Sequence, residues 1–117
     1  MQFDPMKPIW AQVAAALQTD MVTGRLAPGQ KMPSGRDLAV RFTINPNTAA
    51  RVYQELVSQG LCETRRGLGT YVTEDEARLS GLREALAREA AARYLAELER
   101  LGLTRADAVA MIEKEEN

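Results

Sequence analysis

The chain has 117 residues, 45% of them hydrophobic, with a formal net charge of −1, one cysteine and no histidine. A chain of this size forms one domain, or one small domain with an appendage. Because histidine supplies the common general bases, catalytic triads and zinc ligands, its absence predicts no enzymatic activity, no metal site and no cofactor.

The first predicted element is a helix over residues 8–23 that ends at Gly24. Apolar residues recur along it at helical spacing and are assigned to the core: Ile9, Val13, Ala16, Leu17 and Met21. We interpret Trp10 as a packing residue of this helix rather than as a ligand-stacking residue. A turn over residues 26–29 follows and leaves Lys31 exposed as a candidate phosphate contact.

Two closely spaced helices are predicted next. Ser34 can cap a helix that runs to about Phe42, with Asp37 three positions after the cap as in a capping box. Asn45 can cap the following helix, and Pro46 fits its first position, where a missing N–H costs nothing. Only a few residues separate the two helices, so the segment predicts a helix-turn-helix.

The second of these helices has two different faces. One face carries apolar side chains that pack, at Ala49, Val52, Tyr53 and Leu56. The other carries amides, a guanidinium and a hydroxyl, at Asn47, Arg51, Gln54 and Ser58. Amide and guanidinium groups match the donors and acceptors of purine edges in the DNA major groove. The polar face is therefore a candidate DNA-reading surface, with a merely solvated helix face as the alternative.

A β-hairpin is predicted after Gly60, which ends the second helix. Residues 61–65 and 70–73 have the composition of short strands, and Gly67 and Gly69 permit the positive φ angles of a tight connection. Arg65 and Arg66 lie beside its tip. A helix-turn-helix followed by such a hairpin is a winged helix-turn-helix.

The remaining residues predict a helical tail. A long helix is expected over residues 75–101, and a second helix from Thr104, with Asp107 at its third position and Gly102 in the turn. We expect the second helix to bury Val109, Met111 and Ile112. The long helix has one narrow apolar stripe, at Leu79, Leu82, Leu86, Ala90, Tyr94, Leu98 and Leu101.

Two helices of this size cannot enclose a core alone. The apolar stripe therefore needs either the winged domain or the same helices of another subunit as its partner, and dimerisation is the more economical interpretation. The candidate dimerisation residues are Leu79, Leu82, Leu86, Ala90, Tyr94, Leu98, Val109 and Ile112. The predicted fold class is mainly α with a small β-wing, that is, a winged helix-turn-helix followed by a two-helix dimerisation segment.

The distribution of charge also separates the predicted winged domain from the predicted helical tail. Residues 1–73 hold 8 Lys or Arg against 5 Asp or Glu, a net charge of +3, whereas residues 74–117 hold 7 against 11, a net charge of −4. We therefore expect a DNA-binding domain over residues 1–73 and a dimerisation tail over residues 74–117. A local positive patch on the first part is compatible with DNA even though the whole chain is slightly acidic.

At this point the residues resemble a known family, the GntR transcriptional regulators, and within it the YtrA branch. The resemblance covers about two thirds of the chain and rests on these motifs: Pro8-Ile9-Trp10, Gly24-x-Leu26-x-Pro28-Gly29, Met32-Pro33-Ser34-x-Arg36-x-Leu38-Ala39, Asn45-x-Asn47-Thr48, Tyr53-x-x-Leu56, Gly60 and Gly67-x-Gly69-Thr70-Tyr71-Val72. It implies that Arg36 reaches DNA, that the turn from Asn45 to Thr48 enters the major groove, and that the wing tip approaches phosphates or the minor groove. Many relatives have an arginine or serine where this chain has Pro46, which offers no donor.

The candidate DNA contacts follow from the pattern and the resemblance together. Asn45, Asn47 and Arg51 are assigned to base edges, and Arg36 and Thr48 to a base or a phosphate, although Thr48 also has an alternative role in a hydrogen bond at the helix start. Lys31, Arg65 and Arg66 are assigned to the DNA backbone, and the set is completed by Ser34, Gly67 and Gly69.

The predicted function is a transcriptional regulator that binds an inverted-repeat operator as a homodimer, most often a repressor by occlusion in this family. The alternative is a winged helix used only for protein interaction. The YtrA branch lacks the large ligand domain of its relatives, so any small-molecule effector is unknown.

Compartment and cysteine chemistry complete the expectations. The sequence has no run of 18 apolar residues and no basic and apolar leader at its amino terminus, which predicts a cytoplasmic protein that does not enter a membrane. The single cysteine, Cys62, cannot form an intramolecular disulfide, and we interpret it as a packing residue rather than as a nucleophile.

Overall fold

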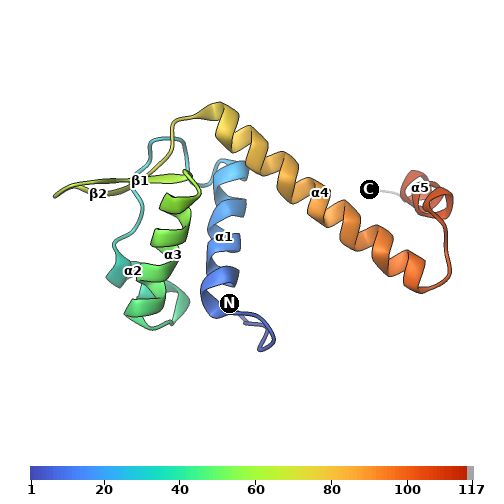
Figure 1. Cartoon of the computed structure of the whole chain (residues 1–117), viewed down its shortest axis with the longest axis horizontal. Helices are drawn as coiled ribbons and strands as arrows, with labels where there is room; N and C mark the ends of the chain where they lie inside the picture. Colours follow the sequence, from blue (N-terminus) through green and yellow to red (C-terminus); the bar gives the residue numbers. More distant parts are fainter. Residues whose placement is uncertain (116–117) are drawn as a thin grey trace. The chain divides into compact units, whose positions relative to one another are not determined.

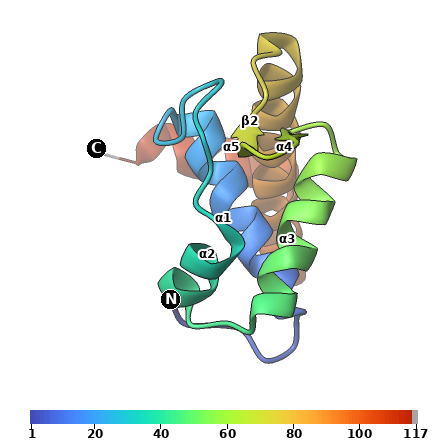
Figure 2. The same ribbon diagram turned by 90° about the vertical axis from the view of Figure 1, so that its left-hand side faces the viewer.

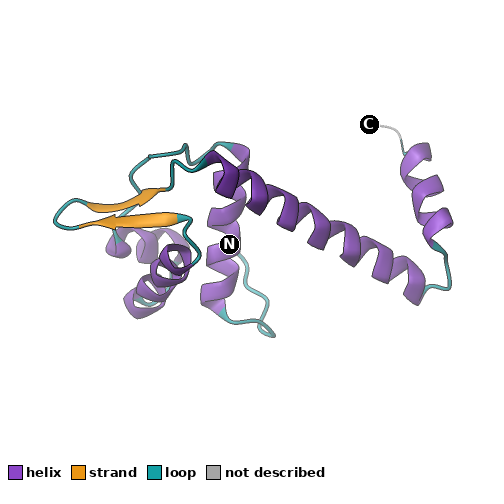
Figure 3. Ribbon diagram, turned by 45° about the horizontal axis from the view of Figure 1, so that its top comes forward, coloured by secondary structure: helices purple, strands orange, loops and turns teal. Residues whose placement is uncertain are grey.

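The computed structural model describes residues 1–115 of the chain. Its elements follow in the order α1 (Ile9–Thr23), α2 (Gly35–Phe42), α3 (Pro46–Ser58), β1 (Cys62–Arg65), β2 (Gly69–Val72), α4 (Glu76–Arg100) and α5 (Arg105–Lys114) (Figure 1). Most of the chain is helical, and the strands form one small hairpin (Figure 3). The predicted fold class, mainly α with a β-wing, is confirmed. None of the described helices combines the length and apolar character needed to span a bilayer.

The helices of the first part begin and end where local chemistry requires. Gly24 ends α1 with a left-handed φ of 84°. The Ser34 hydroxyl accepts a hydrogen bond from the Asp37 N–H at 3.0 Å and so caps α2. The Asn45 side-chain oxygen accepts from the Asn47 N–H at 2.7 Å, with Pro46 in the first turn of α3. These boundaries agree with the predicted ones to within about two residues.

The wing is an antiparallel hairpin in which Cys62 pairs with Val72 and Arg65 with Gly69. A third segment, residues 30–32, which follows the predicted turn over residues 26–29 and for which no strand pairing was predicted, lies along its edge. The Met32 N–H donates to the Thr70 carbonyl at 2.7 Å, and the Val72 N–H donates to the Gln30 carbonyl at 2.8 Å. The segment before α2 is therefore joined to the wing.

The chain divides into two compact units, Met1–Leu82 and Arg83–Asn117. In the first unit α3 contacts both α1 and α2 (Figure 2). The side chains buried most completely come from these helices and from the wing: Val13, Leu17, Leu38, Val52, Leu56 and Val72. The unit extends into the start of α4, because Leu79 is buried in the same core and Leu82 packs against it.

Two positions of α1 differ from each other in their burial. Ile9, assigned to the core, is instead 44% exposed, because it is the first residue of α1 and the buried face begins a turn later, at Val13. Trp10 is half-buried and packs against the core, which confirms its assignment as a packing residue.

The second unit contains α4 from Arg83 onward and all of α5. Gly102, with a φ of 84°, lies in the connection between them, and Thr104 and Asp107 form the predicted capping box at the start of α5. The Thr104 N–H donates to the Asp107 carboxylate at 2.8 Å, and hydrogen bonds from Thr104 lower the pKa of that carboxyl. Leu98 and Ala108 are the buried hydrophobic residues here, and the Tyr94 hydroxyl donates to the Ala108 carbonyl at 3.1 Å.

The prediction that α5 buries three of its apolar residues is wrong within a single chain. Val109 is 50%, Met111 50% and Ile112 60% exposed. One helix end packed on another offers too little surface to cover them, and the small Ala108 takes the buried position.

Candidate nucleic-acid interface

The first turn of α3 presents polar groups to solvent. Asn47 is exposed, and in the described residues its side chain has no hydrogen-bond partner, so both of its amide groups are available. Asn45 is also exposed, but its oxygen already accepts the capping bond at 2.7 Å, which leaves its NH₂ group as the free donor. Thr48 is half-buried. Asn47 is therefore the best placed of the three for a two-point contact with a base edge.

Arg51 is held against α1. Its guanidinium lies over the Trp10 ring, 4.3 Å from the ring centre, and its Nε atom is 3.5 Å from a carboxylate oxygen of Glu55. The side chain is half exposed, but the aromatic ring and the carboxylate already occupy the guanidinium. The helical wheel placed Arg51 on the polar face and could not show that Trp10 of another helix lies beside it.

The start of α2 lies next to α3 and is fixed by it. The Tyr53 hydroxyl of α3 donates a hydrogen bond to the Pro33 carbonyl, directly before the Ser34 cap. Desolvation by burial is the main reason that the pKa of Tyr53 is raised, so the hydroxyl stays protonated and donates. Arg36 follows in the first turn of α2 and is exposed. Tyr53 therefore positions the turn that carries Arg36.

The wing carries one engaged and one free arginine. Arg65 pairs with Glu63, with an N–O distance of 2.7 Å, and its guanidinium lies 4.1 Å from the centre of the Tyr71 ring. Arg66 at the tip is exposed and, among the described residues, has no ion-pair partner. Of the two, Arg66 is the freer to contact a phosphate.

Lys31 contacts the wing, although it precedes α2 in the sequence. It forms a β-bridge with Tyr71, and its side chain crosses Gly69 so closely that a Cβ there would lie 3.0 Å from the lysine Cε. Gly69 also has a φ of 123°, a conformation that side chains strongly disfavour. The predicted phosphate contact is thus placed beside the wing tip rather than on an independent turn.

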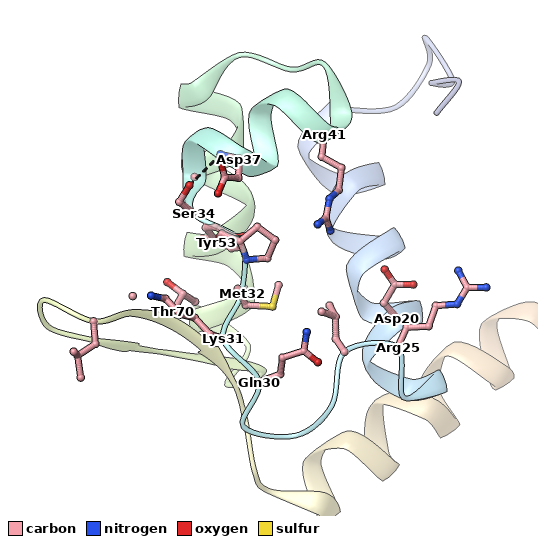
Figure 4. A pocket seen from close by; sticks show the side chains of 15 residues that line it. Asp20, Arg25, Gln30, Lys31, Met32, Ser34, Asp37, Arg41, Tyr53 and Thr70 are labelled. Atoms are coloured by element: carbon pink, nitrogen blue, oxygen red, sulfur yellow. Dashed lines mark hydrogen bonds between the residues drawn. The ribbon is translucent and has the colours of Figure 1, made fainter.

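A cleft of about 1090 Å³ separates the start of α2 from the wing (Figure 4). Three candidate DNA contacts line it: Lys31 and Ser34 from the segment before α2, and Gly69 from the wing. Two further cations in its wall, Arg25 and Arg41, were not predicted from the sequence. Asp20 and Asp37 partly offset their charge.

The sequence did contain a signal that could have identified Arg25 and Arg41. Arg41 is four residues after Asp37 on a short helix, which places both on one face, and Arg25 follows the glycine that ends α1. The structure does not bring Asn47 or Arg51 into this cleft, since neither residue lines it.

Two other kinds of site were considered, a reactive cysteine and a metal site. Cys62 is buried and packs in the core, as interpreted from the sequence. Burial also raises the pKa of its thiol to about 11. Within residues 1–115 no three His, Cys, Asp or Glu side chains are grouped in a way that could hold a metal ion.

A short helix, a turn, a second helix with a polar first turn and a basic two-stranded wing together define a winged helix-turn-helix DNA-binding regulator. Residues 10–72 match the model of the gntR family of bacterial regulatory proteins, and the chain belongs to this family. The resemblance noted in the sequence is thereby confirmed.

Two curated relatives from Bacillus subtilis show how far the similarity extends. The uncharacterized HTH-type transcriptional regulator YhcF is 38% identical over 104 residues, which cover 89% of this chain and 86% of YhcF. The HTH-type transcriptional repressor YtrA is 40% identical over 77 residues, 64% of this chain and 59% of YtrA. These relatives support the YtrA-like assignment.

Solved structures agree with the sequence comparison. A GntR family transcriptional regulator from Listeria monocytogenes superposes with a TM-score of 0.89 at 35% identity, covering 97% of this chain and all of that one (100%). The DNA-binding domain of AraR, solved in complex with operator ORX1, has a TM-score of 0.58 at 31% identity and covers 62% of this chain and 93% of that domain.

Proposed function

We propose that this chain is a transcriptional repressor that binds an inverted-repeat DNA operator as a homodimer. The observation that carries the proposal is the exposed, polar first turn of α3, flanked by Arg36 and by a wing with Lys31 and Arg66. Support comes from AraR, whose similar domain was solved on an operator, and from YtrA, which is named a repressor.

Base reading is assigned mainly to Asn47. Its free amide can form a bidentate contact with adenine in the major groove. Asn45 contributes its NH₂ group, and Arg36 contacts a base or a phosphate. Thr48 is assigned to a phosphate, because a half-buried hydroxyl reaches the backbone more easily than a base edge. Arg51 mainly holds α3 against α1 through Trp10 and secondarily faces DNA.

Backbone contacts are assigned to the cleft and the wing. Lys31 and Arg66 supply free positive charge, whereas Arg65 acts with part of its charge offset by Glu63. Gly67 and Gly69 adopt the positive φ angles that the tip requires, and because they have no Cβ the tip can approach the sugar-phosphate chain closely. The Ser34 cap fixes the start of α2 at the cleft.

The homodimer is proposed from the apolar residues of the second unit that one chain leaves uncovered. Leu101 is 59%, Val109 50% and Ile112 60% exposed. A second copy of the same helices offers a matching apolar surface, and a twofold dimer presents two recognition helices to successive major grooves, roughly 34 to 36 Å apart. Of the predicted stripe, Leu79 and Leu82 pack in the first unit, so the proposed interface relies on the residues from Leu86 onward.

Repression follows if the dimer occupies a promoter and excludes polymerase. We place the protein in the cytoplasm and assign it no catalytic role, consistent with YhcF and YtrA, which are named a transcriptional regulator and a transcriptional repressor. The second candidate, a winged helix that docks on protein alone, leaves the free amide of Asn47 without a function.

The test is selection of bound sequences from a random DNA pool, followed by titration of the best sequence at several salt concentrations. We expect an inverted repeat whose half-sites lie about 10 base pairs apart, centre to centre. Lys31→Ala and Arg66→Ala should each weaken operator and unrelated DNA by the same factor and reduce the salt slope by about 1.

Arg88→Ala is the matched control, because Arg88 pairs with Glu84 outside the first unit and should leave the slope unchanged. A pool without enrichment, together with a salt slope near zero, would contradict DNA binding and favour the protein-docking alternative.

A further inference from the structure

An apolar hollow of about 410 Å³ lies at the junction of α2 and α3. Its lining residues come from α2, the turn and the first residue of α3: Arg36, Ala39, Val40, Thr43, Ile44 and Pro46. Val40 is 75% exposed, more than any other large aliphatic residue of the described helices. Ile44 packs against the core on one side, whereas Val40 and Pro46 are exposed, so these two residues form an apolar surface that packing within the chain leaves uncovered.

The position of this hollow relates it to DNA. Val40 is four residues after Arg36, so the two share one face of α2, and Pro46 opens the turn of α3 that carries Asn47. The charges fit a polyanion, because Arg36 is the one charged residue that lines the hollow and no carboxylate does. The apolar surface thus lies between two groups that the proposed function directs to DNA.

The major groove displays one kind of apolar group, the C5-methyl of thymine. Pro46 lacks an N–H and therefore cannot read hydrogen-bonding groups through its backbone donor, but its ring can pack on a methyl. Val40, which also lines the hollow, carries two methyl groups. Both residues suit an apolar contact and neither suits a polar one.

We propose that Val40 and Pro46 read thymine methyl groups in the operator and so add to its specificity. This inference rests on the proposed function and deepens it, because it names a chemical group of the DNA and the side chains that recognise it. It also explains how a chain with proline at the start of α3 gains sequence information from that position.

The test compares the selected operator with copies in which single thymines are replaced by deoxyuridine, which lacks only the C5-methyl. Wild-type protein should bind the operator about fourfold more weakly when a contacted thymine is replaced, the expected effect of one buried methyl group. Replacement at positions outside the contact should have no effect. Affinity can be measured by fluorescence anisotropy.

Protein variants connect the effect to the hollow. In Val40→Ala the penalty for deoxyuridine should fall below about twofold at one position, whereas Val57→Ala should keep the full penalty. Val57 is a matched control because it is also exposed, at 37%, but lies in the last turn of α3. Since both side chains are exposed, neither change should unfold the protein.

Equal binding of thymine and deoxyuridine operators at every position would overturn the proposal while leaving operator recognition intact. An unchanged penalty in Val40→Ala would overturn the assignment to this hollow, and a Val40→Ala variant that loses only a protein partner would identify a protein-docking surface instead. Absence of any operator would remove the proposed function, and this inference with it.

Discussion

Tyr53 shows how a single side chain links the core to the proposed DNA-binding surface. Its hydroxyl donates to the Pro33 carbonyl just before the α2 cap, and its ring packs against the core. We expect Tyr53→Phe to lower the free energy of unfolding by about 1 kcal/mol, because a partly buried carbonyl loses its donor. Urea denaturation monitored by circular dichroism measures this change.

Tyr71→Phe is the control for this prediction. The Tyr71 hydroxyl lies 3.5 Å from the Leu68 carbonyl in an exposed position, a distance at which a hydrogen bond contributes little. Its removal should change the free energy of unfolding by less than about 0.5 kcal/mol. Equal effects of the two substitutions would show that the Pro33 contact does not stabilise the fold.

Cys62 predicts a loss of stability at alkaline pH. Burial raises the pKa of its thiol from 9.0 to about 11, so the folded state retains a proton that the unfolded state releases. This contribution is fully present below pH 9 and is lost as the pH rises toward 11, at a cost of about 2 kcal/mol. Urea titrations between these pH values should show a smaller decline for Cys62→Val than for wild type, and an identical decline would contradict the prediction.

Contacts between side chains of different elements could not be predicted from the sequence. It correctly placed Asn47 on an exposed face and Cys62 in the core, because both follow from local periodicity and composition. It did not show Arg51 above Trp10, since that contact joins residues whose separation in sequence is unrelated to helical spacing. Lys31 beside Gly69 was hidden for the same reason.

At the scale of elements, the turn between α2 and α3 contains a strained residue. Thr43 adopts a left-handed φ of 55°, which is unfavourable for a β-branched side chain, and its N–H bonds to α2 carbonyls that a glycine would also satisfy. We expect Thr43→Gly to raise the free energy of unfolding by about 1 kcal/mol. Thermal and urea denaturation of Thr43→Gly and wild type measure this difference in the free energy of unfolding.

The matched control is Thr19→Gly, within α1. Thr19 lies in a right-handed helix, and its hydroxyl donates to the Ala15 carbonyl at 3.1 Å, so glycine should lower the stability there by about 0.5 kcal/mol. The two substitutions should therefore have opposite signs. A loss of stability at both positions would show that the turn is not strained.

Element boundaries were largely predictable because they depend on short-range chemistry. Caps at Ser34, Asn45 and Thr104 and the left-handed glycines at the ends of α1 and α4 are signals contained within a few residues. The segment beside the wing was not predicted, since its β-bridge pairs Lys31 with Tyr71 over a long sequence separation. Pairing of this kind requires knowledge of the tertiary fold.

At the scale of the whole molecule, the proposed dimer depends on the exposed apolar residues of α5. We expect Ile112→Glu to convert the dimer to a monomer in sedimentation velocity and to weaken binding to the full inverted repeat at least tenfold. Binding to an isolated half-site should be unaffected. The monomer fold should persist, because Ile112 is 60% exposed within one chain.

Ala92→Glu is the control for charge on this part of the chain. Ala92 is exposed on α4, about 200° around the helix from Ala90 of the predicted stripe, and should leave the assembly unchanged. An Ile112→Glu protein that remains dimeric would exclude this face of α5 from the interface.

The most direct test of the account is the affinity of wild type and Asn47→Ala for the selected operator and for a scrambled duplex of the same composition. We predict that Asn47→Ala loses about 5- to 100-fold on the operator and less than twofold on the scrambled duplex, while Ser58→Ala, at the other end of α3, changes neither. Equal losses on both duplexes, or none on the operator, would contradict the claim that the first turn of α3 reads DNA sequence.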